Sequence, residues 1–151
     1  MPCTLRAPTL DELPALSALC LRSKAVWGYD AGFLEACRKE LTIEPGELET
    51  TSIMVAEDGG EIVGVVQVRS IGSEADLLKL FVEPTALRGG IGRMLFVWVV
   101  EQAATHGADR LVIEADPDAA PFYRRMGAED CGFTPSGSIQ GRLLPRLVKQ
   151  L

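Results

Sequence analysis

Apolar residues in the first forty positions recur at intervals of three and four, the spacing that places side chains on one face of a helix. Residues 13–20 contain one such face and residues 31–41 contain a second. Thr9 and Glu12 have the spacing of a capping box, which marks the start of the first helix. The pattern therefore predicts two early helices, preceded by a short strand over residues 4–7.

From residue 52 onward the pattern is mostly that of strands. Residues 52–57 and 61–70 flank Asp58-Gly59-Gly60, which is a hairpin signal. A long helix is expected over residues 91–105; it is apolar around most of its circumference and must therefore be buried on most sides. The remaining strands are expected at 76–82, 110–115, 130–134 and 143–149, with a short helix at 121–126. This order predicts an α+β fold with an antiparallel meander and a strand–helix–strand unit.

Length and hydropathy agree with one packed domain. The chain has 151 residues, and 47% of them are hydrophobic. A chain of that size buries ~70% of its unfolded surface, so residues 1–151 are expected to form a single domain. No apolar run approaches the ~20 residues of a membrane-spanning helix. Since no N-terminal signal follows Met1 either, we expect a cytoplasmic protein with no membrane partner.

Charge and cysteine spacing exclude two further classes of function. The net charge of −6 argues against a general nucleic-acid binder, which would present a basic face. It leaves room for a cationic substrate such as an amine. Cys3, Cys20, Cys37 and Cys131 are widely spaced, and His106 is the one histidine. A zinc site needs clustered ligands, so no metal is expected, and the thiols are typical of a reducing cytosol.

Residues 80–95 contain the most informative motif. An apolar run ends at Pro84, and a glycine-rich passage leads into the long helix. Glycines let the backbone approach a ligand closely, and a helix N-terminus attracts phosphate. A Cβ at position 90 or 92 would then stand where backbone meets phosphate. The Walker pattern fails because a lysine and a hydroxyl are missing, and the Rossmann pattern lacks its third glycine. Two interpretations of the glycine-rich passage remain, a phosphate-binding turn and a plain strand-to-helix turn.

Two segments together resemble one known family. Val82-x-Pro84 followed by Gly90-Ile91-Gly92-Arg93 is similar to the acetyl-CoA loop of the GNAT N-acetyltransferase superfamily. Residues 116–128, with Ala119, Phe122-Tyr123 and Gly127, are similar to a second block of that superfamily, although Asp116 stands where asparagine is common and Ala128 replaces an aromatic residue. The resemblance covers about residues 4–148. It implies the GNAT acyl-CoA N-acyltransferase fold, a mixed, mostly antiparallel sheet with a splayed central strand pair and flanking helices.

The resemblance also implies an activity and a set of cofactor-binding residues. The expected reaction moves an acetyl group from acetyl-CoA to a primary amine of a small molecule, by direct attack in a ternary complex. The backbone of the strand before the loop is expected to pair with the cofactor arm, and the loop to bind its pyrophosphate. The residues expected to contact acetyl-CoA are Phe81, Val82, Leu87, Arg88, Gly89, Gly90, Ile91, Gly92, Arg93, Asp116 and Tyr123.

Two residues are candidates for proton transfer. Tyr123 matches the superfamily's acid, and a phenol is protonated at neutral pH and can donate to a departing sulfur; the alternative is a core tyrosine beside Phe122. Asp76 is the candidate base, because period-two parity puts it on one strand face with Leu80 and Val82. A solvated carboxylate is the alternative for Asp76. The competing bases are Glu74, Glu83, Glu114, Asp116 and a chain of water.

Acceptor-binding residues are expected in two segments that should approach each other. Trp27, Tyr29 and Asp30 lie in a break between helices, and Arg142 lies in a glycine-rich loop. Aromatic walls with Asp30 and Arg142 would suit an acceptor that bears an amine and an acid. A packed helix corner and a plain hairpin are the structural alternatives. A non-catalytic CoA-binding regulatory module and a protein N-acetyltransferase are the alternative functions, and the chain is expected to be a monomer or a homodimer.

Overall fold

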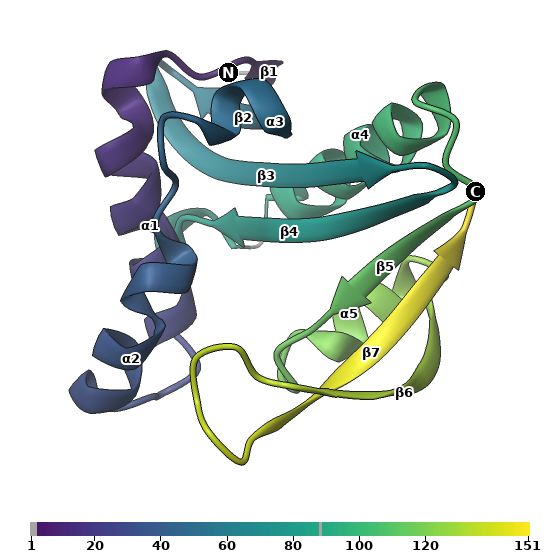
Figure 1. Ribbon diagram of the computed structural model, residues 1–151. Coiled ribbons are helices and arrows are strands. Elements are labelled where there is room, and N and C mark those ends of the chain that lie inside the picture. Colours follow the sequence, from purple (N-terminus) through teal and green to yellow (C-terminus); the bar gives the residue numbers. More distant parts are fainter. Residues whose placement is uncertain (1–2, 88) are drawn as a thin grey trace.

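A seven-stranded sheet forms the frame of the protein. The computed structural model describes residues 3–87 and 89–151. The strands lie in the order β1-β2-β3-β4-β5-β7-β6, and all neighbours are antiparallel except β4 and β5 (Figure 1). The strands are β1 (Thr4–Arg6), β2 (Ser52–Asp58), β3 (Glu61–Ile71), β4 (Glu74–Val82), β5 (Arg110–Glu114), β6 (Glu129–Pro135) and β7 (Leu143–Gln150). The predicted α+β fold with a mixed, mostly antiparallel sheet is confirmed.

Helices cover both faces of this sheet. In Figure 1, α1 and α2 lie on one side of the strands and α4 lies behind them. The helices are α1 (Leu13–Ala25), α2 (Ala31–Leu41), α3 (Glu47–Thr50), α4 (Ile91–Thr105) and α5 (Ala120–Arg125), with short 3₁₀ turns η1 (Leu10–Glu12) and η2 (Pro84–Ala86). The capping box at Thr9 is formed, with Glu12 Oε1 accepting from the Thr9 N–H at 2.8 Å. The hydrophobic pattern predicted these helices except α3, which is too short for a periodic signal.

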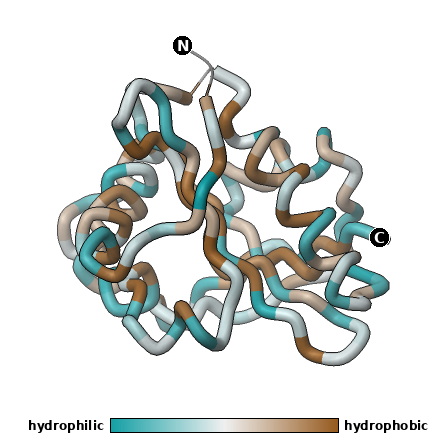
Figure 2. Tube along the Cα trace, turned by 90° about the horizontal axis from the view of Figure 1, so that it is seen from above, coloured by the Kyte–Doolittle hydropathy of each residue, from teal (hydrophilic) through white to brown (hydrophobic). Residues whose placement is uncertain are grey.

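Two apolar cores lie on the two faces of the sheet. Along β3, Val65 packs with the α1 and α2 side, while Val66 and Val68 pack under α4. This alternation is the period-two pattern of a strand that is covered on both faces. Figure 2 shows hydrophobic segments running through the middle of the molecule and many hydrophilic segments at its periphery. The central strands are therefore held rigidly between two layers of helices.

The parallel pair β4 and β5 separates part-way along its length. Pairing runs from Glu74 with Arg110 to Leu77 with Ile113 and ends there, while β4 continues to Val82. The other edge of β4 stays paired with β3 to its end. Figure 1 shows the two strands diverging. The predicted splayed central pair is confirmed, and β4 has an edge after Leu77 that no strand covers.

A β-bulge lies where this separation begins. Val68 of β3 pairs with Leu77 of β4, but the preceding residue Gln67 pairs with Lys79. Leu78 is therefore an extra residue with no partner on β3. A bulge of this kind bends its strand and shifts the alternation of side chains by one position.

The bulge overturns one expectation about Asp76. Leu77, before the bulge, and Leu80 and Val82, after it, all pack in the core under α4. Asp76 is the neighbour of Leu77 and so lies on the opposite face of the strand. The prediction that Asp76 shares a face with Leu80 and Val82 is wrong, because the extra residue Leu78 shifts the alternation of side chains by one position.

Close packing of α4 on β3 depends on Gly64. A Cβ built at this position would lie 2.9 Å from Leu95 Cδ1 and 3.0 Å from Ile91 Cγ2. We expect Gly64→Ala to lower the free energy of unfolding by about 1–3 kcal/mol, the usual cost of overpacking a core. Urea denaturation measures this. Gly46→Ala is the control, since its Cβ would meet nothing within 4 Å and its φ is −63°; equal stability of the two variants would contradict the prediction.

Candidate active site

The glycine passage forms an open turn at the start of α4. Gly90 has a left-handed φ of 77° and is the N-cap of the helix. The Met94 N–H is the first to bond back, to the Gly90 carbonyl at 3.1 Å. Within the described part of the chain, no bond joins the N–H groups of Ile91, Gly92 or Arg93 to another residue. These three donors and the positive end of the helix dipole are what a phosphate would meet.

The glycines of this turn have different surroundings. A Cβ at Gly90 would meet no atom of residues 3–87 and 89–151 within 4 Å, so among these residues the backbone borders open space. A Cβ at Gly92 would instead lie 3.5 Å from the ring of Phe122. This is an ordinary contact distance, and the expectation that a Cβ at Gly92 would stand where backbone meets phosphate stays a prediction. Gly89 and Arg93 are exposed, Leu87 is 48% exposed, and Arg88 lies outside the described residues.

Phe81 and Val82, the two predicted cofactor-binding residues on β4, lie where β4 has separated from β5. Phe81 pairs with Val65 and Val82 pairs with Gly64, both on β3. Their side chains point to opposite cores, Val82 under α4 and Phe81 toward the α1 side. On the β5 side this segment has no strand partner. Unpaired strand edges offer a row of hydrogen-bonding groups to an extended ligand.

Tyr123 lies on α5 and is almost fully buried, with 7% of the residue exposed. Its ring packs against Phe122 at 5.2 Å and Phe96 at 5.8 Å between centroids. Burial raises the pKa of Tyr123, so its hydroxyl stays protonated at neutral pH. Both predicted roles, proton donor and core aromatic, agree with this environment.

Three charged or polar side chains from distant segments meet at the carboxylate of Asp116. The Tyr29 hydroxyl donates to Asp116 Oδ2 at 2.6 Å, and Arg142 Nη2 donates to the Tyr29 oxygen at 2.6 Å. Lys24 Nζ and Arg142 Nη2 each lie 3.4 Å from the same Asp116 oxygen. We refer to Lys24, Tyr29, Asp116 and Arg142 as the Tyr29 cluster. It brings together the two segments that the sequence analysis expects to approach each other.

An aromatic pair supports the Tyr29 cluster. The rings of Tyr29 and Phe33 stack with centroids 4.1 Å apart and planes at 13°. The Arg142 guanidinium carbon lies 4.8 Å from the Phe33 centroid, and Lys24 Nζ lies 5.9 Å from it. These distances are within the range of cation–π attraction. Sequence reasoning missed Lys24 and Phe33, although Phe33 follows Tyr29 by four positions, a helical spacing that could have indicated it.

Two predicted acceptor residues have other surroundings. The Asp30 carboxylate accepts from the Phe33 N–H at 2.8 Å and caps α2, which is a common use of aspartate at a helix start. Trp27 is 44% exposed. Neither residue is part of the Tyr29 cluster. Their role in acceptor binding stays a prediction.

Charges set the protonation of the Tyr29 cluster. Burial raises the pKa of Asp116. The hydrogen bonds from Tyr29 and the Asp118 N–H lower it, as do the charges of Lys24 and Arg142. The lowering effects are larger in sum, so the pKa of Asp116 lies below its ordinary value. Burial and the contact with Asp116 raise the pKa of Tyr29 to about 12. At neutral pH the cluster therefore holds a carboxylate, a neutral phenol and two cations.

Asp76 lies apart from these groups. Its carboxylate is 3.5 Å from Arg69 Nη2, and its side chain is 35% exposed. Among the competing bases, Glu74 pairs with Arg110 at 2.6 Å and Glu83 with Arg22 at 2.8 Å. The assignment of Asp76 as the base stays a prediction.

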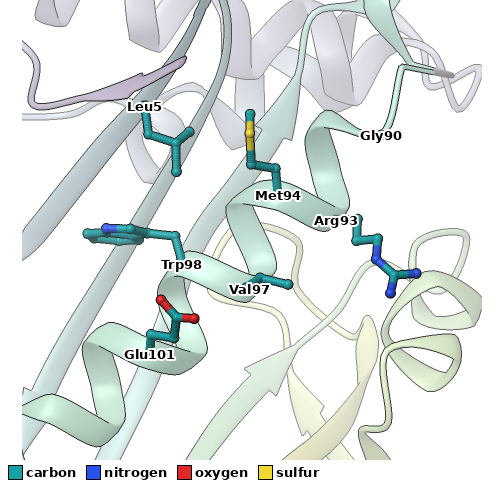
Figure 3. Close-up of a pocket in the computed structure, with 7 residues that line it drawn as sticks. All are labelled: Leu5, Gly90, Arg93, Met94, Val97, Trp98 and Glu101. Atoms are coloured by element: carbon teal, nitrogen blue, oxygen red, sulfur yellow. The ribbon is translucent and has the colours of Figure 1, made fainter. Parts of the chain in front are cut away.

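A hollow in the surface adjoins the start of α4. It has a volume of about 410 Å³ and is lined by Leu5, Gly90, Arg93, Met94, Val97, Trp98 and Glu101 (Figure 3). Figure 3 shows Arg93 pointing away from Trp98. A second hollow, of about 320 Å³, lies beside α1 and the start of β3. Neither is lined by Tyr123 or by the Tyr29 cluster.

The described residues form neither a metal-ligand cluster nor a membrane-spanning helix. Nowhere in residues 3–87 and 89–151 do three or more histidine, cysteine or carboxylate side chains gather in a way that could hold a metal ion. None of the helices in this part of the chain has the length and apolar character needed to span a bilayer.

Comparison with known proteins assigns the family. The family model described as an acetyltransferase (GNAT) domain matches residues 21–139 of this chain. The chain belongs to the GNAT acetyltransferase family. A curated relative, an IAA acetyltransferase of Azospirillum brasilense, is 32% identical over 90 residues, which are 56% of this chain and 59% of that protein. The chain thus matches about three-fifths of the length of that relative.

Solved structures share the fold over their full length. The PaiA N-acetyltransferase of Thermoplasma acidophilum, in complex with coenzyme A, is 15% identical, with a TM-score of 0.80 and 100% of both chains covered. A ribosomal-protein-alanine N-acetyltransferase of Brucella melitensis is 27% identical, with a TM-score of 0.70 over 98% of this chain and 99% of that one. The predicted GNAT fold is thereby confirmed.

The hydrogen bond from Tyr29 is expected to control the titration of Asp116. In Tyr29→Phe the carboxylate loses a donor, so its pKa should rise toward the ordinary value of ~3.9. Stability that depends on the ionised carboxylate is lost as the pH falls through the folded-state pKa, so the variant should lose it at a higher pH than the wild type. Carboxyl ¹³C NMR titration measures the pKa. Tyr123→Phe is the control, and an identical Asp116 titration in both variants would refute the proposed contact.

Proposed function

We propose that this protein transfers an acetyl group from acetyl-CoA to a primary amine of a small molecule, by direct attack in a ternary complex. The observation that supports this most is the separation of β4 from β5 with the open glycine turn at the end of β4. Family membership adds to it. The proposal assigns the cosubstrate to the strand edge and the turn, and the acceptor to the side on which the Tyr29 cluster lies.

The β4–α4 turn suits the pyrophosphate of the cosubstrate. The N–H groups of Ile91, Gly92 and Arg93 lie at a helix start next to open space at Gly90, and the exposed Arg93 can add a positive charge. The uncovered edge of β4 at Phe81 and Val82 suits the amide groups of an extended cofactor arm. The cosubstrate supplies the thioester from which the acetyl group is transferred.

Tyr123 is proposed to be the acid of the reaction. The amine nitrogen forms a bond to the thioester carbon, the carbon–sulfur bond breaks, the amine loses a proton and the thiolate gains one. Burial raises the pKa of Tyr123, so the phenol is protonated at neutral pH and can donate its proton to the departing sulfur as the carbon–sulfur bond breaks. For the amine proton, we propose Asp76 or a chain of water as acceptor. The exposure of Asp76 and its pairing with Arg69 favour transfer through water over direct contact.

Two contacts favour a small acceptor over a protein. Arg142 bonds to Tyr29, and the Ser138 hydroxyl donates to the Glu40 carboxylate. Both join the loop between β6 and β7 to the α1–α2 region. A polypeptide acceptor that ran between these two segments would have to break both contacts, whereas a small amine would not.

Cosubstrate binding is expected to depend on Gly90. In Gly90→Ala the added Cβ would occupy the open space at the turn, and we expect acetyl-CoA to bind about tenfold more weakly or worse, ~1.4 kcal/mol, by calorimetry. The left-handed φ adds a strain of about 1–2 kcal/mol. Gly107→Ala is a matched control at the other end of α4, with φ of +87° and an equally open Cβ position. Equal affinity in the two variants would rule out the phosphate-binding turn.

Turnover is expected to depend on the Tyr123 hydroxyl. Tyr123→Phe keeps the ring packing and removes the proton, so release of CoA thiol should slow by ~10²-fold, the usual scale for a positioned acid, with acetyl-CoA affinity nearly unchanged. Wild-type turnover in this variant would leave Tyr123 as a core residue. If the wild-type protein binds acetyl-CoA but releases no thiol with any amine, the chain is a CoA-binding regulatory module instead.

A further inference from the structure

The Tyr29 cluster contains more positive than negative charge. Lys24 and Arg142 both face Asp116, and the exposed fractions of the three side chains are 14%, 19% and 10%. Asp30, the acidic residue next to Tyr29 in sequence, is occupied as the cap of α2. Two largely buried cations therefore share one carboxylate. Such an excess of charge, shielded from water, attracts an anion strongly.

Asp116 does not saturate the donors of the two cations. Its Oδ2 atom receives the Tyr29 hydroxyl at 2.6 Å, whereas both cations are 3.4 Å away. Its other oxygen accepts from the Asp118 N–H. Arg142 uses only Nη2 in its contacts with described residues, and Lys24 uses one long contact for three N–H groups. Several charged donors are left for another partner.

The Nε and Nη1 donors of Arg142, which have no partner among the described residues, are not fully enclosed. Among the described residues, no side-chain nitrogen or oxygen is both fully enclosed and without a hydrogen-bond partner. The stacked rings of Tyr29 and Phe33 form an apolar wall beside the donors. Phe33 belongs to the same apolar cluster as Phe81 on the uncovered end of β4. Through their contacts with Phe33, the two cations lie on the α1–α2 face of the sheet, toward which the Phe81 side chain also points.

We propose that Lys24 and Arg142 bind an anionic group of the acceptor, so that the substrates are amines that also carry a carboxylate or a phosphate. The inference rests on the proposed function and narrows its substrate class. Guanidinium and ammonium groups suit these anions, and an arginine binds a carboxylate or phosphate through paired N–H groups. The aromatic wall accommodates the carbon skeleton between the two functional groups. Asp116 holds the two cations in place until the acceptor arrives.

Matched acceptor pairs test this substrate class. Glycine and other α-amino acids are compared with their amides, and 2-aminoethyl phosphate is compared with ethanolamine, so that carboxylate and phosphate are scored separately. We expect kcat/KM to be about tenfold higher or more for the anionic member of at least one pair, the scale of a hydrogen bond to a charged group. Equal kcat/KM within every pair would overturn the inference.

Variants identify the residues responsible. Lys24→Gln and Arg142→Gln should raise KM for the anionic acceptor about tenfold or more and leave KM for the neutral partner and for acetyl-CoA nearly unchanged. Arg142→Glu should reverse the preference. Arg38→Gln is the control, because Arg38 forms a surface pair with Glu35 on α2. If Lys24 and Arg142 only hold the fold together, their variants will affect both members of a pair equally, and the inference is wrong.

A binding experiment separates this inference from the proposed function. Calorimetry measures the affinity of acid and amide for the protein saturated with CoA, with no turnover required. Tighter binding of the acid, lost in Lys24→Gln, supports the anion site even if no acetyl transfer occurs. Equal binding of acid and amide refutes the anion site even if transfer to neutral amines is rapid.

Discussion

The parting of β4 from β5 is the constraint on which the rest of the structure depends. Two parallel strands at the centre of a sheet would ordinarily pair along their full length, because buried backbone groups need partners. Here pairing ends at Leu77, and the bulge at Leu78 bends β4 at the same place. Pairing with β3 holds β4 in position on its other edge. The result is a short strand segment with one edge free, rigidly supported by two cores.

The connection from β4 to β5 explains the position of the glycine turn. Parallel strands need a crossover, and α4 is that crossover. Its N-terminus follows the uncovered end of β4 after η2 and the glycine turn, so the chain leads from the free strand edge to the start of the helix. Gly64 on β3 lets the helix pack closely. Hydrophobic packing thus holds two polar features in place, the free edge of β4 and the N-terminus of α4.

Positive charge is concentrated at both ends of this arrangement, although the chain has a net charge of −6. One place is the start of α4, with its helix dipole and Arg93. The other is the Tyr29 cluster, which joins the α1–α2 corner to the segments after β5 and before β7. Tyr123 lies on the helix that follows β5. Under the proposed function, the first place would hold the anionic cosubstrate and the second the anionic group of the acceptor.

Much of this protein follows from its sequence. Apolar spacing determined the helices and strands of the sheet, because burial of apolar faces dominates their stability, and two short motifs pointed to the GNAT fold. Tertiary structure alone decided the site around those motifs. The bulge at Leu78 moved Asp76 to the opposite face, and an inserted residue has no periodic signature. The Asp30 carboxylate caps α2, which depends on local geometry. Tyr29, Asp116 and Arg142 meet only because the strands between them fold back. The sequence indicated that the segments of Tyr29 and Arg142 approach each other, but not that Asp116 lies where they meet.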